Sequence, residues 1–411
     1  MKKIIYILSF LMLALTVKVS AQNELNQYLE IAAENNPGLK VKFNEYMAAL
    51  EKVPQVGALP DPVVAFGYFI QPVETRVGPQ QAKISASQMF PWFGTLSSRE
   101  NSVESLAKAK YEVFEEAKSK LFYDVKSTYY NLYFIHQAID ITVENIDILA
   151  SFKSLANIKV ESGSASSVDA YRVQMEINDL ENQLALLKDN AQVLSVKFNS
   201  FLNIDANTSI QIAENLTEAL LFNKYSELDS VLMNNNTLAA FDYQIEGLQH
   251  RQKLASKEGL PQFNIGFDYT FIGEGSSTSP NAGQDAFMFP KVGITVPLYR
   301  KKYKAKVQEV IYLQEAKTNE KSDRKNTLTV LFESGWKDYQ DANRRSSLYK
   351  EQEDLAEKSL SILESNYATS NMDFEEILRM ERKLLKYALE LQKANADKEA
   401  AVAFIQYLQG K

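Results

Sequence analysis

The stretch "PQFNIGFDYTFIG", residues 261–273, alternates between apolar and polar or small side chains almost without error. One face of an extended chain would carry Phe263, Ile265, Phe267, Tyr269 and Phe271, and the other face Asn264, Gly266, Asp268 and Thr270. This pattern predicts a β-strand. Alternation of this length, with so many aromatic residues, is typical of a strand between lipid and water, and a half-buried strand of a soluble protein also alternates.

The first residues have the pattern of a secretory signal peptide. Lys2 and Lys3 form a basic start, residues 4–17 are apolar, and Val19-Ser20-Ala21 provides a small-residue cleavage site. We therefore expect residues 1–21 to be removed and the mature chain to leave the cytoplasm.

Composition excludes several classes of function. The 411 residues include no cysteine, which excludes disulfides and thiolate metal sites. The net charge is −7 with no basic block, so nucleic acid is not an expected partner. The two histidines, His136 and His250, have no partners at metal or triad spacing, and no phosphate loop or nucleophile motif is present. We expect neither an enzyme nor a cofactor.

The chain contains an internal repeat. Residues 29–53 and 228–252 are both helical in pattern, both carry an Asn pair before a Leu, and both lead into a Leu-Pro. Two alternating stretches follow in each half. The expected strands are residues 63–70 and 83–90 in the first half, and 261–273 and 291–298 in the second. We divide the mature chain into repeats at 22–215 and 216–411.

Each repeat ends in a predicted helical hairpin. Long polar helices are expected at residues 98–159 and 303–366, with returning helices at 168–202 and from about 374 to 408. A helix of 60 residues is about 90 Å long. The returning helices carry apolar residues at steps of three and four, which predicts coiled-coil packing. An ordinary antiparallel helical hairpin is the alternative for this element. The seam positions are Ile177, Leu180, Leu184, Leu187, Ala191, Leu194, Phe198 and Phe201, and later Ile377, Met380, Leu384, Tyr387, Leu391, Ala394, Lys398, Ala401, Ile405 and Leu408.

Four strands are too few to close a barrel, since single-chain barrels have at least eight. Open strand edges are not tolerated in lipid. Three copies would supply twelve strands, with the aromatic face toward lipid and Asn264, Asp268 and Thr270 toward a water-filled lumen. The alternative is a soluble hairpin packed on the helices.

Two motifs lie at the ends of the helical hairpins. In "VESGSASSVDAY" the residues of interest are Gly163, Ser166 and Asp169, and in "YATSNMDFEEIL" they are Tyr367 and Ser370. With these motifs about 207 residues apart and the heptads in one register, the mature sequence resembles the TolC-like outer-membrane efflux family.

The resemblance implies an α+β fold in which a trimer forms a twelve-stranded outer-membrane barrel, continued by a periplasmic barrel of coiled helices. The hairpin ends, with Gly163, Ser166, Asp169, Tyr367 and Ser370, would dock on a periplasmic adaptor (membrane fusion protein) coupled to an inner-membrane transporter.

The resemblance also implies an acidic ring at the periplasmic entrance. By motif position the ring maps onto Glu376. The family's further acidic position is Arg379 here, which would leave a single ring or neutralise part of it, and Asp373 is a nearby substitute.

The segment "SQMFPWFGTLSSR", residues 87–99, resembles the strand-to-helix turn of the outer-membrane partners of heavy-metal pumps. Pro91, Gly94 and Arg99 match that pattern, whereas Thr95 replaces the usual Lys. Pro91 and Gly94 are suited to a bend between barrel and helices, because Pro fixes φ and Gly permits positive φ.

The sequence therefore predicts a passive exit duct for drugs, metal ions or secreted proteins. A periplasmic adaptor would also have a signal peptide and a coiled coil, but with one helical hairpin rather than two in tandem. A secreted hydrolase with helical insertions would need convergent acid, base or metal residues.

Overall fold

The computed structural model describes residues 20–163, 166–216, 220–221, 223–275, 280–369 and 374–411. The predicted signal peptide, residues 1–21, lies almost wholly outside them. Long helices dominate, together with one four-stranded antiparallel sheet, and this confirms the α+β class. In the described residues, no helix has an apolar stretch long enough to cross a membrane.

The chain forms two compact units, and each draws on both sequence repeats. Unit 1 comprises Met1–Val41, Phe114–Asn236 and Lys325–Lys411, and unit 2 comprises Lys42–Val113 and Thr237–Arg324. The repeat boundary at residue 215 stays a prediction.

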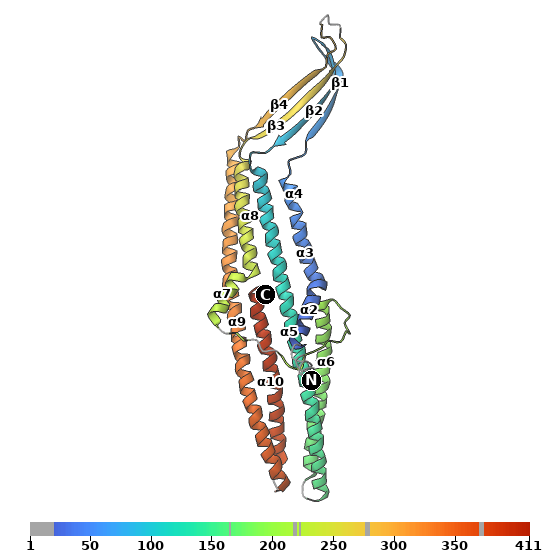
Figure 1. Ribbon diagram of the computed structural model, residues 1–411, viewed down its shortest axis with the longest axis vertical. Coiled ribbons are helices and arrows are strands. Elements are labelled where there is room, and N and C mark those ends of the chain that lie inside the picture. The colour runs from blue at the N-terminus through green and yellow to red at the C-terminus, as the bar shows by residue number, and fades with distance from the viewer. Residues whose placement is uncertain (1–19, 164–165, 217–219, 222, 276–279, 370–373) are drawn as a thin grey trace, which may run out of the picture. The chain divides into compact units, whose positions relative to one another are not determined.

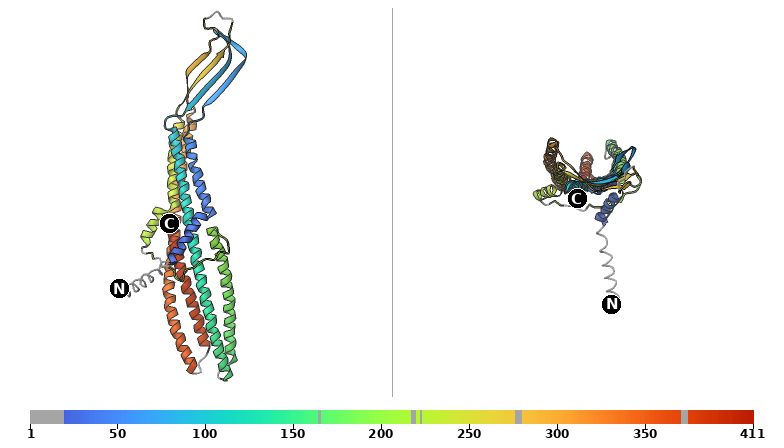
Figure 2. Two further views of the ribbon diagram at one scale, coloured as in Figure 1. Left: turned by 45° about the vertical axis from the view of Figure 1, so that its right-hand side comes forward. Right: turned by 90° about the horizontal axis from the view of Figure 1, so that it is seen from above.

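Unit 2 contains the sheet, whose strand order is β1-β2-β3-β4 (Figure 1). The strands are β1 (Val63–Thr75), β2 (Gly78–Phe90), β3 (Gln262–Ile272) and β4 (Ala286–Thr295). Every neighbouring pair is antiparallel, so the hairpins of the two repeats join through β2 and β3. Within this sheet β1 and β4 are the edge strands, as Figure 2 also shows.

Three strand ends extend beyond the sequence prediction, and β4 ends earlier than predicted, at Thr295 rather than at residue 298. The predicted loop between residues 70 and 83 is mostly strand, because β1 runs to Thr75 and β2 starts at Gly78. The strand pattern was hidden by Pro72, which lies where the β1–β2 register shifts between Tyr68 and Val73. A bulge accommodates proline because its ladder hydrogen bond is already missing. Likewise β4 begins at Ala286 rather than at residue 291, with Pro290 in a second register shift.

The two faces of the sheet have the predicted chemistry. Lys83 pairs with Thr270, and Ser85 with Asp268, which places polar side chains of β2 and β3 on one face. The other face carries apolar pairs such as Ala86 with Phe267. Rings continue across that face into β4, where Phe287 lies 6.0 Å from Phe267 between ring centroids.

Unit 2 also holds helices next to the sheet. They are most of α3 (Pro37–Leu50), α4 (Lys52–Gly57), α8 (Asn236–Glu258) and the first parts of the two longest helices, α5 (Thr95–Glu161) and α9 (Arg300–Thr369).

Unit 1 is built from two helical hairpins and the shorter helices that pack on them. It contains α2 (Ser20–Asn35), α6 (Ser167–Leu202), α7 (Lys224–Asn234), α10 (Phe374–Leu408) and the later parts of α5 and α9. The predicted seams are confirmed: Ile177, Leu180 and Phe198 of α6 are buried, as are Ile377 and Ile405 of α10.

Asparagines mark equivalent positions in the two repeats. The predicted helix 29–53 is broken at Asn36, whose Oδ1 accepts from Leu39 N at 3.0 Å and so caps α3. Asn36 Nδ2 donates to Phe201 O at 3.0 Å, near the end of α6. Asn235, between α7 and α8, donates to Leu408 O at 2.9 Å, at the end of α10. Each junction therefore satisfies a carbonyl at the end of its repeat's returning helix, which side chains often do.

Candidate functional site at the hairpin ends

The ends of the α5–α6 and α9–α10 hairpins lie together at one end of unit 1 (Figures 1 and 2). A shared apolar cluster joins them, with Val173 and Ile177 of α6 against Phe374, Ile377 and Leu378 of α10. The two motifs identified in the sequence are thus brought to one place.

In the first turn the motif residues have local structural roles. Gly163 has φ +72°, a conformation that glycine adopts without strain. Ser166 caps α6, its hydroxyl accepting from Val168 N at 3.2 Å. Asp169 stands in the first turn of α6, where a negative charge interacts favourably with the helix dipole.

The second turn is anchored by Tyr367. Its side chain is 5 % exposed, and its ring centroid lies 5.1 Å from that of Phe374. Lys159 of α5 donates to Tyr367 O at 2.7 Å, and its ammonium lies 3.5 Å from the ring centroid. Burial, and secondly the Asp169 carboxylate, raise the pKa of the Tyr367 hydroxyl. Ser370 and Asp373 lie outside the described residues.

Ion pairs connect α6 with α10. Arg382 donates to Glu176 at 2.9 Å and to Glu375 at 2.7 Å, which bridges the two hairpins. Arg172 Nη1 lies 3.6 Å from Asp169 and 3.7 Å from Glu375. All these groups are partly exposed, so each pair contributes little alone, and their significance lies in holding the hairpin ends in one arrangement.

Glu376 forms an ion pair with Arg379 one turn later on α10. Both side chains are exposed enough to meet solvent, at 40 % and 57 % of their side-chain surface. Arg379 thus neutralises part of the charge of Glu376.

Sequence reasoning missed Glu381, a buried acid beside these residues. It is 1 % exposed, and its Oε1 accepts from Asn145 of α5 at 3.3 Å. In the described part of the chain its Oε2 has no hydrogen-bond partner. Burial, and secondly the Glu364 carboxylate, raise the pKa of Glu381 to about 7. The spacing in the sequence could have identified Glu381, because it follows the seam residue Ile377 by one helical turn and so lies on the same face of the helix.

The predicted lumen residues lie on the polar face of the sheet in unit 2. Asp268 is 3 % exposed and pairs with Lys83 at 2.8 Å and Lys291 at 3.1 Å. Thr270 is half-buried, and Asn264 is exposed. Asp268 therefore has two lysine partners on this face, and the alternation pattern did not identify that pairing.

The bend predicted at Pro91 and Gly94 lies between β2 and α5. Gly94 has φ +74°, and α5 begins at the next residue. Lys257 of α8 donates to Gly94 O at 2.8 Å, which satisfies a carbonyl at the exposed bend. Trp92 stacks on Phe263 of β3, with ring centroids 5.7 Å apart.

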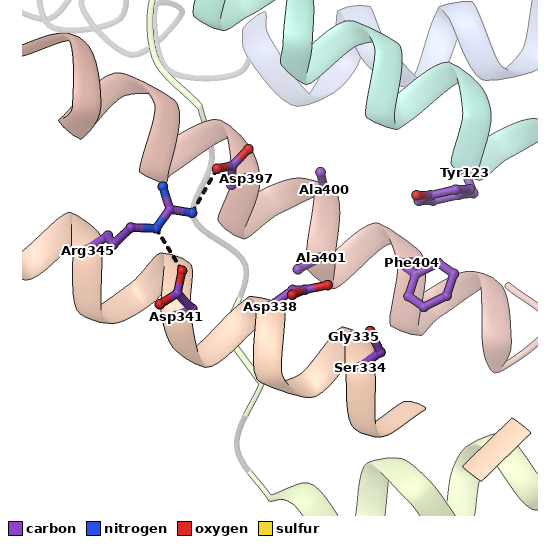
Figure 3. Close-up of a pocket in the computed structure, with 10 residues that line it drawn as sticks. All are labelled: Tyr123, Ser334, Gly335, Asp338, Asp341, Arg345, Asp397, Ala400, Ala401 and Phe404. Atoms are coloured by element: carbon purple, nitrogen blue, oxygen red, sulfur yellow. Dashed lines mark hydrogen bonds and ion pairs between the residues drawn. The ribbon is translucent and has the colours of Figure 1, made fainter. Parts of the chain in front are cut away.

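A cavity of about 380 Å³ lies between α5, α9 and α10 in unit 1 (Figure 3). At one end Arg345 donates to Asp341 and Asp397, both at 2.8 Å. Tyr123 and Phe404 line the other end, with ring centroids 5.4 Å apart. Because the guanidinium already has two carboxylate partners, its evident role is to tie α9 to α10.

No family model matches the sequence. An uncharacterised protein of Haemophilus influenzae is 21 % identical over 241 residues, 56 % of this chain and 52 % of that protein. Toxin and drug export protein A of Aggregatibacter actinomycetemcomitans is 21 % identical over 54 % of this chain and 49 % of its own length. The chain thus matches about half the length of these curated relatives.

Solved outer-membrane proteins match almost the whole chain in structure. The outer-membrane protein VceC of Vibrio cholerae has a TM-score of 0.77 at 13 % identity, over 94 % of this chain and 96 % of its own. The outer-membrane channel OprN gives 0.75 at 16 % identity, over 94 % and 90 %. CusC gives 0.75 at 12 % identity, over 94 % and 92 %. The chain therefore has the fold of the TolC-like outer-membrane channels.

Proposed function

We propose that the chain is the outer-membrane exit duct of a tripartite efflux or type I secretion system. It would extend into the periplasm and passively conduct drugs, metal ions or secreted proteins from an adaptor and an inner-membrane pump. The observation that carries this proposal is the fold likeness to outer-membrane channels over 94 % of the chain. The export role in the name of the Aggregatibacter relative supports it.

The sheet supports a trimeric assembly. It has two open edges, β1 and β4, and one face rich in aromatic and aliphatic side chains. On β1 Ile70 is 90 % exposed, and on β4 Val292 is 67 % exposed. Pairing β4 of one copy with β1 of the next would remove the edges, and the apolar face would then meet lipid. Asn264, Asp268 and Thr270 would line the lumen, and Pro91 and Gly94 would turn each chain from barrel to helix.

The hairpin ends in unit 1 are the proposed periplasmic entrance. Glu376 would face the pore as a gate residue, moderated by Arg379, with Asp373 as a second candidate. The turns carrying Gly163, Ser166, Asp169, Tyr367 and Ser370 would dock on the adaptor. The presence of two hairpins in tandem favours this role over that of the adaptor itself, for which one hairpin is expected.

Fractionation of the producing cells, followed by reconstitution in planar bilayers, tests the proposal. We expect the protein in the outer-membrane fraction and discrete ion-conducting steps after purification. Recovery as a soluble periplasmic protein that forms no channels would contradict it.

A further inference from the structure

A cavity of about 490 Å³ in unit 2 lies between α5 and α8, with further lining from α3, α4 and α9. Its floor is apolar. Val103, Leu106, Ala109 and Val113 of α5 contribute to it, as does Leu248 of α8. A cavity of this volume is within the range that binds small organic ligands.

Close contact between α5 and α8 shapes one end of the cavity. Ser102 Oγ donates to Gly247 O at 2.8 Å, and this bond is buried. A Cβ at Gly247 would lie 3.1 Å from Ser102 O, tighter than ordinary van der Waals contact. A side chain at this position would therefore require a small shift of α5 or α8, and glycine lets the two helices pack closely beside the cavity.

The charged residues that line the cavity all have one sign. They are Lys52, Lys110, Arg251 and Lys317, and no carboxylate is among the lining residues. An apolar floor under four cationic groups is complementary to a ligand with a hydrocarbon tail and an anionic head. Lysine and arginine stems can also cover such a tail while their charged ends stay in water.

The cationic groups are available to a ligand. In the part of the chain that the structure describes, Lys52 makes no ion pair. Lys110 lies 3.5 Å from Glu45, and Arg251 3.5 Å from Glu309, with both cations about half exposed. Only Lys317 has a short contact, 2.6 Å to Glu320. Exposed pairs at such long separations are weak, so an anionic head group can replace them at small cost.

We propose that this cavity binds a long-chain fatty-acid anion. The hydrocarbon tail would lie on Leu106 and Leu248, and the carboxylate would be held by Lys110 and Arg251, with Lys52 and Lys317 adding positive charge. This site is separate from the hairpin ends and does not depend on the proposed exit duct.

Displacement of a fluorescent fatty acid from the full-length protein in maltoside detergent tests the proposal. The probe is dansylaminoundecanoate, and the competitors are dodecanoate, dodecanol, dodecyltrimethylammonium and acetate. We expect efficient displacement by dodecanoate, weaker displacement by dodecanol, and none by the cation or by acetate. The double variant K110Q/R251Q should bind the probe about tenfold more weakly, because two charge-assisted contacts are lost.

The matched control is K108Q/K253Q, which removes two exposed cations from the same two helices outside the cavity. It should bind like the unmodified chain. A second variant, L106E, places a carboxylate on the floor and should abolish binding while thermal unfolding stays close to that of the control. Equal displacement by the neutral and cationic amphiphiles, or unchanged binding by K110Q/R251Q, would overturn the proposal.

Discussion

At the scale of single residues, the hairpin ends combine structural and electrostatic roles. Gly163 sets a backbone conformation, Glu376 carries a charge that Arg379 partly cancels, and Glu381 is an acid held in an apolar interior. These three roles respond to different substitutions, and each can be tested separately.

Replacing Gly163 with valine should impair adaptor engagement. A β-branched residue at φ +72° is strained by about 1–2 kcal/mol or more, so the turn would change shape. The measurement is complementation of an efflux-deficient strain at matched trimer levels. Gly163→Asn is the control, because asparagine visits the left-handed region readily. Full activity of the valine variant would remove this turn from the docking surface.

Glu376 and Arg379 should have opposite effects on the entrance. Glu376→Ala should raise single-channel conductance or weaken block by a trivalent cation, because a carboxylate is lost. Arg379→Gln should strengthen that block, because the Glu376 carboxylate loses its partner. Both are measured in planar bilayers from the periplasmic side. If neither variant differs from the unmodified channel, Glu376 is not part of the gate.

Glu381 should make the stability of the protein depend on pH. Its pKa is raised from 4.5 to about 7, so the folded protein favours the protonated carboxyl. This contribution is fully present below pH 4.5 and is lost as pH rises through about 7. The loss is at most on the order of 3 kcal/mol per protomer.

Thermal unfolding at pH 5 and pH 8 measures this effect. Glu381→Gln should flatten the dependence, because the amide keeps the shape and cannot ionise, whereas Glu390→Gln on the same helix should leave it unchanged. An equal pH dependence in the Glu381→Gln protein would assign the effect to other groups.

At the scale of elements, periodicity predicted most of what the structure shows. The alternation in β3 and the heptads of α6 and α10 were sufficient to identify these elements. Side chains on one face of an element share one environment, so residues of one kind recur with the period of the strand or helix. Pro72 and Pro290 hid the extensions of β1 and β4, since a bulge that tolerates proline depends on the neighbouring strand. The partners of Asp268, Tyr367 and Glu381 were also unpredictable, because Lys83, Lys159 and Asn145 are distant in sequence.

The thermal stability of the oligomer should depend on the charge of Asp268, which lies on the polar face of the sheet. Asp268→Asn would leave Lys83 and Lys291 facing each other without a counter-charge, so the oligomer should dissociate at a lower temperature. Adding Lys83→Gln should recover much of that loss, because the repulsion disappears. Heated samples on native gels show both effects. If the double variant dissociates at the same temperature as the single variant, the effect of Asp268 comes from the shape of its side chain and not from its charge.

At the scale of the whole molecule, the proposed function depends on the assembly of several copies of the chain into one closed barrel. The described part of one chain supplies four strands with two open edges, and three chains would supply twelve, which is above the minimum of eight strands for a closed single-chain barrel. The fold likeness supports such a duct, and the apolar face of the sheet gives the physical reason for it.

The most direct test of this account is the sedimentation mass, in detergent, of protein extracted from the outer-membrane fraction. The account predicts a heat-labile species with three times the mass of the mature chain. A soluble monomer from the periplasm would contradict it, because the aromatic face of the sheet would then have to pack against protein.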